Sequence, residues 1–105
     1  MTTTEINPPT SADLRGKIAA LDVALADAES DFDLYAAEVV ASVDGAGKRV
    51  AEANAKIERL KVERRILERA CEKAARAEAE AAAAAEADER AAALEAARQN
   101  VAKLI

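Results

Sequence analysis

Few residues in this chain have the type and spacing that catalysis or ligand binding would need. The chain has no histidine and a single cysteine, Cys71, so a cysteine–histidine pair and an internal disulfide are both excluded. Its carboxylates are spread along helical positions without the spacing of a metal site or of a paired acid and base. We therefore expect a non-enzymatic protein with no cofactor and no metal.

One short stretch, Gly45-Ala46-Gly47-Lys48, is superficially similar to a phosphate-binding loop. The full motif has a glycine five residues before its second glycine and a serine or threonine after the lysine. This chain has Ser42 and Arg49 at those two positions. We interpret the stretch as a turn between two helices.

Residues 48–76 carry ten basic and five acidic side chains, which makes a nucleic-acid-binding module the alternative function. The acids are interleaved with the bases, and the segment contains no aromatic residue. Residues 1–47 carry nine acids against two bases. We expect the basic segment to lie against this acidic one, which disfavours nucleic acid as a partner.

Apolar residues recur at alternating steps of three and four on both sides of residues 44–47, as in coiled coils. This pattern predicts an all-α fold, an antiparallel two-helix hairpin whose long second helix extends past the first. We call the predicted contact positions the seam. They are Leu14, Ile18, Leu21, Leu25, Ala28, Phe32, Tyr35, Val39, Val50, Ala53, Ile57, Leu60, Arg64, Leu67, Cys71 and Ala74.

Helix signals divide the chain into three parts. Residues 1–10 are expected to be a disordered tail, because Pro8 and Pro9 oppose a helix. Residues 11–78 form the hairpin, with a capping box from Thr10 and Asp13 and a turn near 44–47. The first helix should end at about Val43, with Gly45 or Gly47 in the left-handed conformation. Residues 79–105 form an alanine-rich helical extension.

The alternative to the hairpin is one unbroken helix with a stutter near the glycines.

Folding the chain at residues 44–47 predicts a register in which Val39 faces Ala53, Tyr35 faces Ile57 and Phe32 faces Leu60. The same register continues as Ala28 with Arg64, Leu25 with Leu67, Leu21 with Cys71, and Ile18 with Ala74. In it Arg64 is a polar seam residue within reach of Asp27 or Asp31. Cys71 is expected to be a small buried apolar residue, and the Tyr35 hydroxyl to lie at the seam edge.

Two further apolar groups fall outside the seam. Val23, Leu34, Val62 and Ile66 are expected to lie close together near the middle of the hairpin, with Val62 and Ile66 level with residues 30 and 26. Such a cluster predicts a homo-oligomer, most simply a dimer in the form of a four-helix bundle. Near the end of the chain, Leu94, Val101, Leu104 and Ile105 are predicted to dock a protein partner.

The region from Leu14 to Ala77 resembles small alanine-rich helical-hairpin proteins of bacterial genomes and prophages. The resemblance rests on Ile18-Ala19-Ala20-Leu21-Asp22 before the turn and on Ala53-Asn54-Ala55-Lys56-Ile57-Glu58-Arg59-Leu60 after it. It implies a role in assembly or adaptation and supplies no functional residues. We therefore expect a structural or adaptor protein, including phage-type scaffolding. With no signal-peptide pattern and no apolar span, the expected location is the cytoplasm, or a virion if phage-derived, with no membrane partner.

Overall fold

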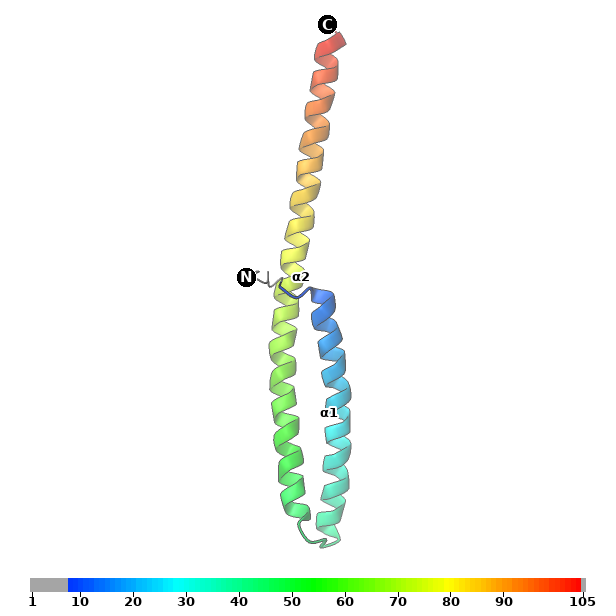
Figure 1. The fold of residues 1–105 in the computed structure, drawn as a ribbon, viewed down its shortest axis with the longest axis vertical. Coiled ribbons are helices and arrows are strands. Elements are labelled where there is room, and N and C mark those ends of the chain that lie inside the picture. The colour runs from blue at the N-terminus through cyan, green and yellow to red at the C-terminus, as the bar shows by residue number, and fades with distance from the viewer. Residues whose placement is uncertain (1–7, 105) are drawn as a thin grey trace, which may run out of the picture.

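Two antiparallel helices joined by a short connection make up the fold, as the computed structural model of residues 8–104 shows (Figure 1). Helix α1 spans Ser11–Val40 and helix α2 spans Ala46–Leu104. The 59 residues of α2 are about twice the 30 of α1, so the second half of α2 runs on alone past the start of α1. The molecule measures 94 Å along its longest axis. The expected all-α hairpin with a longer second helix is confirmed.

The start of α1 follows the predicted capping box. The Asp13 amide donates to Thr10 Oγ1 at 3.1 Å, and the Thr10 amide donates back to Asp13 Oδ2 at 3.3 Å. These bonds satisfy amides that have no partner within the helix. Pro8 and Pro9 precede the cap in non-helical conformation and are exposed; the rest of the predicted tail, residues 1–7, lies outside the described residues.

The end of α1 differs from the prediction. The helix ends at Val40, three residues before the expected Val43, and the left-handed residue that ends it is Ser42, with φ 61°. The Val43 amide donates to the Glu38 carbonyl at 2.9 Å and the Ser42 amide donates to the Val39 carbonyl at 3.0 Å. This pair of bonds is a Schellman motif built on a serine. The connection therefore covers residues 41–45, and the turn predicted near 44–47 lies a few residues too late.

Gly45 has a different role from the one expected. It adopts φ 76°, but it sits immediately before α2, and its carbonyl accepts from the Arg49 amide at 3.2 Å. Gly47 belongs to the first turn of α2. Neither glycine ends α1.

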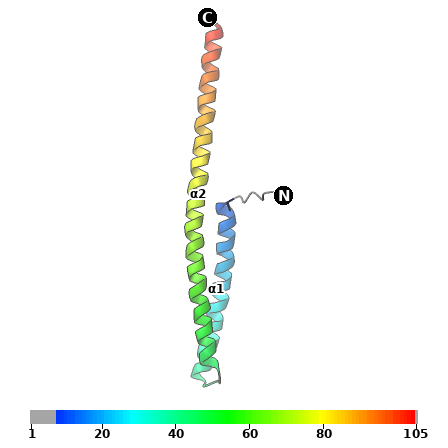
Figure 2. The ribbon, with the colours of Figure 1, turned by 60° about the vertical axis from the view of Figure 1, so that its left-hand side comes forward.

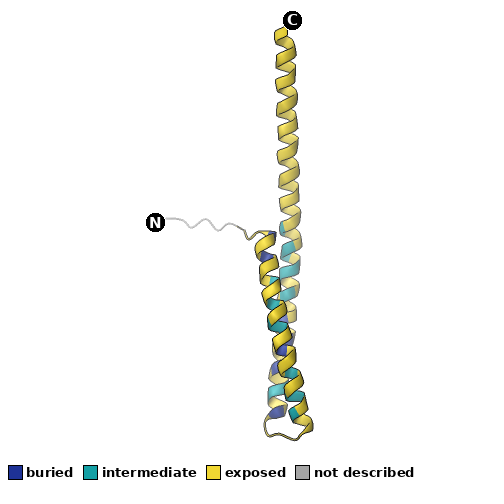
Figure 3. Ribbon diagram, turned by 90° about the vertical axis from the view of Figure 1, so that its right-hand side faces the viewer, coloured by how far each residue is buried: buried dark blue, intermediate teal, exposed yellow. Residues whose placement is uncertain are grey.

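Burial follows the predicted seam along the hairpin (Figure 3). Ala28, Ile57 and Leu60 form its buried centre, against which Leu25 and Phe32 pack. Every expected seam residue is buried or half-buried except Val39, which is 45% exposed. Val39 lies one residue from the end of α1. Ala46, which the seam prediction omitted, is 1% exposed at the start of α2.

The register of the two helices is one heptad away from the predicted one. Arg64, expected opposite Ala28, bonds to Asp22, and Cys71, expected opposite Leu21, lies 3.6 Å from the Ser11 carbonyl oxygen. Ala28 instead lies with Ile57, seven residues before its predicted partner. Each residue of α1 therefore meets α2 about seven residues earlier than expected.

The early end of α1 accounts for this shift. Both helices repeat every seven residues, so a slide of one heptad leaves the same positions on the seam and changes only their partners. Ending α1 at Val40 and starting α2 at Ala46 moves the centre of the hairpin toward the N-terminus. The helices then lie alongside one another from this connection to the start of α1 (Figure 2).

Candidate functional site

A three-residue ionic cluster at Arg64 joins the two helices. Arg64 Nε donates to Asp22 Oδ1 at 2.6 Å, and its guanidinium also pairs with Glu68 on the next turn of α2. The hydrogen bond to Asp22 raises the pKa of Arg64, and desolvation opposes the rise. Arg64 is therefore cationic at all ordinary pH values. The predicted partners Asp27 and Asp31 do not bond to it, because the register places Asp22 there.

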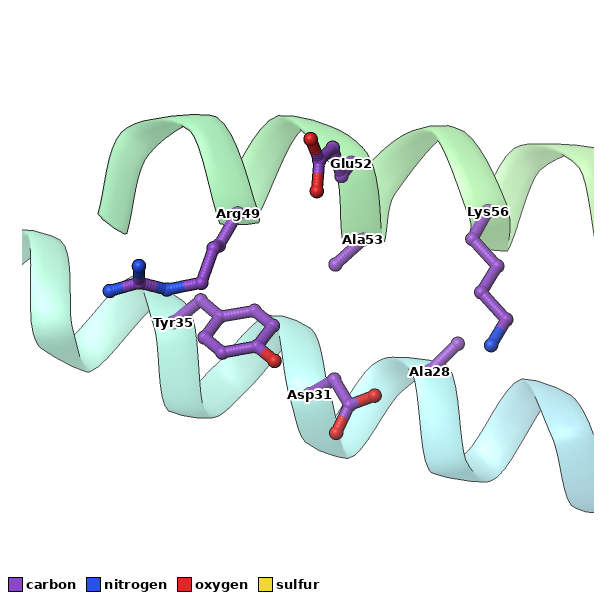
Figure 4. Close-up of a pocket in the computed structure, with 7 residues that line it drawn as sticks. All are labelled: Ala28, Asp31, Tyr35, Arg49, Glu52, Ala53 and Lys56. Atoms are coloured by element: carbon purple, nitrogen blue, oxygen red, sulfur yellow. The ribbon is translucent and has the colours of Figure 1, made fainter. Parts of the chain in front are cut away.

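A shallow groove beside the seam brings charged residues of both helices around an alanine floor (Figure 4). Arg49 donates to Glu38 Oε2 at 2.9 Å, and its guanidinium carbon lies 5.6 Å from the centre of the Tyr35 ring. Asp31, Glu52 and Lys56 complete the rim over Ala28 and Ala53. Lys61 forms a longer ion pair with Glu58 at 3.8 Å. These contacts pair Arg49 and Lys61, two cations of the basic segment 48–76, with acidic side chains.

A hydrogen-bonded junction marks the point where α1 stops covering α2. The Ser11 amide and hydroxyl donate to the two carboxylate oxygens of Glu78, each at 3.0 Å, and Cys71 Sγ lies 3.6 Å from the Ser11 carbonyl oxygen. Ser11 is only 6% exposed. A carboxylate is favourable here, because it meets the positive end of the α1 dipole.

This junction was missing from the sequence prediction, although a signal for it exists. Glu78 continues the seven-residue series of seam positions that runs through Ile57, Arg64 and Cys71. An acid at that position, level with a helix N-terminus, is a recognisable capping partner.

The apolar group predicted for self-association does not form one cluster. Val23, Leu34, Val62 and Ile66 are all exposed, at 51–64%. Val23 and Val62 each lie two residues from seam positions on both sides, which puts them on the outer sides of their helices, facing away from each other. The Arg64–Asp22 contact places Ile66 level with about residue 20, so it is on the order of 20 Å from Leu34 along the hairpin. These four residues therefore do not form the surface through which the four-helix bundle was expected to assemble.

The extension of α2, residues 79–104, is exposed along its whole length (Figure 3). Leu94, Val101 and Leu104 expose 55%, 59% and 87% of their surface. Ile105, the fourth predicted docking residue, lies outside the described residues. The extension continues α2 without interruption, so it projects from the hairpin as a single straight element.

A second hollow lies at the shoulder, where the extension leaves the hairpin. It is lined mainly by apolar residues from the start of α1 and from α2, namely Pro8, Pro9, Leu14, Ala70, Ala74 and Ala77, with Lys73 beside them. We call it the shoulder groove. It adjoins the Ser11–Glu78 junction.

Residues 8–104 contain no group of three histidine, cysteine, aspartate or glutamate residues close enough to hold a metal ion. Neither α1 nor α2, as described, is long and apolar enough to cross a membrane.

No protein-family model, no curated protein and no solved structure matches this chain.

Proposed function

We propose that this chain is a non-enzymatic structural or adaptor protein that acts by helix-mediated self-association and protein binding. A phage-type assembly or scaffolding role is the concrete form suggested by its resemblance to small prophage helical-hairpin proteins. The observation that carries the proposal is the uncovered extension of α2, which exposes Leu94, Val101 and Leu104 on a helix with no packing partner in residues 8–104.

The physical reason is a mismatch between the two parts of α2. The half beside α1 packs an apolar seam, whereas the half beyond Glu78 has apolar side chains that no other described residue, from 8 to 104, covers. Helices in proteins gain most of their stability from tertiary packing. Grouped exposed apolar residues are typical of protein-binding surfaces.

Light scattering after gel filtration, over a concentration series, tests the proposal directly. We expect the intact protein to show a multiple of its 11.0 kDa chain mass that dissociates on dilution. A single chain mass at every concentration would contradict self-association.

A matched pair of variants assigns the association to the apolar side of the extension. Leu94→Asp should weaken association at least tenfold, because it places a charge in the contact. Ala92→Asp adds the same charge two residues away, on the opposite side of the helix, and should leave the mass unchanged. Equal effects of the two variants would place the contact elsewhere.

A further inference from the structure

The extension has a strongly uneven charge distribution along its length. From Glu80 to Glu89 it carries four acids and no base, namely Glu80, Glu86, Asp88 and Glu89. From Arg90 to Lys103 it carries three bases, Arg90, Arg98 and Lys103, and a single acid, Glu95. All of these residues are exposed. The extension is thus acidic next to the hairpin and basic toward its free end.

An apolar stripe runs along the same segment. Residues at alternating steps of four and three from Ala83 are apolar apart from Arg90, and they lie on one side of the helix: Ala83, Ala87, Leu94, Ala97, Val101 and Leu104. The alanines occupy the acidic half and the larger side chains the basic half. The stripe is out of phase with the hairpin seam.

We infer that the extension pairs in antiparallel orientation with the extension of a second copy of this chain. The inference rests on the proposed self-association and adds its geometry. An antiparallel pair sets the acidic half of each copy against the basic half of the other, twice, by symmetry. A parallel pair sets acids against acids, which disfavours it. Opposed helix dipoles add to the preference.

The stripe is also complementary to itself in this orientation. When Ala87 of one copy faces Ala97 of the other, Ala83 faces Val101. At the Ala87–Ala97 and Ala83–Val101 positions a small residue then opposes a small or larger one, which lets the helices approach closely there. Arg90 faces Leu94 in this register, one residue from the level of Glu95 of the other copy.

The same register brings the free end of each α2 to the shoulder of the other copy. Leu104 lies level with residue 80 of the second copy, within one turn of Ala77 in the shoulder groove. The apolar lining of that groove, including Leu14 and Ala74, suits the exposed side chain of Leu104. The two hairpins are then at opposite ends of a rod about 140 Å long, at 1.5 Å per helical residue.

Cysteine cross-linking in the full-length chain tests the orientation. In a Cys71→Ser background, Ala87→Cys and Ala97→Cys are made as two separate proteins and oxidised alone and as a mixture. The antiparallel pair predicts a disulfide-linked dimer in the mixture and none in either protein alone, because each cysteine is about 15 Å from its own copy. Self-linking of either protein, or no link in the mixture, overturns the inference.

Small-angle scattering of the unmodified dimer provides an independent measurement. A maximum dimension near 140 Å supports the antiparallel pair, whereas a parallel pair stays close to the 94 Å of one chain. Light scattering distinguishes a wrong orientation from the absence of self-association. A dimeric mass with self-linked cysteines overturns only the orientation, and a single chain mass at all concentrations overturns the proposed self-association as well.

Discussion

The ion pair between Arg64 and Asp22 is partly exposed, at 36% and 52% of the two side chains, so its contribution to stability is modest. Its value lies in its position, because it links one turn of α2 to one turn of α1. In the register expected from a turn at residues 44–47, Arg64 would face Ala28 and reach Asp27 or Asp31. The identity of its acidic partner therefore reports the register.

A double-mutant cycle measures the coupling free energy between Arg64 and its acidic partner. Arg64→Ala combined with Asp22→Asn should show a small favourable coupling free energy in urea unfolding followed by circular dichroism. The same cycle with Asp27→Asn should give a coupling near zero. Coupling to Asp27 in place of Asp22 would indicate the other register, in which Arg64 lies opposite Ala28.

Two glycines at the turn of the hairpin, Gly45 in the connection and Gly47 in the first turn of α2, have opposite backbone requirements. Gly45 adopts φ 76°, where an added Cβ is strained and would lie 3.3 Å from the Arg49 guanidinium. Gly47 is helical, and nothing lies within 4 Å of an added Cβ. The same substitution should therefore have opposite effects two residues apart.

Gly45→Ala should lower the free energy of unfolding by about 1 kcal/mol, because of the left-handed backbone. Gly47→Ala should raise it by about 0.5 kcal/mol, because alanine favours the helix and restricts the unfolded chain. Urea unfolding of the two variants beside the parent measures both. Similar changes in the two variants would contradict a left-handed Gly45 beside a helical Gly47.

The Ser11–Glu78 junction divides α2 into a covered half and an uncovered half. Residues before it share the seam with α1, whereas every residue of 79–104 is exposed. The hairpin and the extension should therefore respond independently to changes in sequence.

Removal of residues 94–105 should spare the hairpin and abolish association. Of these residues, 94–104 are exposed and outside the seam, so the melting temperature should change by only about 2 °C, measured at a dilution where both chains are monomeric. Light scattering at higher concentration should then give only the single-chain mass. A large loss of helical structure from residues 11–78 would show that the tail belongs to the core.

Several features of the fold follow from local sequence alone. The steps of three and four placed the seam correctly at every position but Val39, and Thr10 with Asp13 predicted the start of α1. The end of α1 could not be predicted in the same way, because serine is uncommon at positive φ and Ser42 carries no helix-ending signal. The Val23, Leu34, Val62 and Ile66 group failed for a related reason, since its expected proximity depended on the predicted register.

The amino-acid pattern specifies which side of each helix is apolar, where α1 begins, and the opposite charges of the two arms. It does not specify which heptad of α2 lies beside which heptad of α1, because a seven-residue slide preserves the apolar contact. That choice depends on where α1 ends and on contacts far apart in sequence, such as Arg64 with Asp22 and Ser11 with Glu78. These contacts form only when the chain has turned back at Ser42, so the register is a property of the folded hairpin.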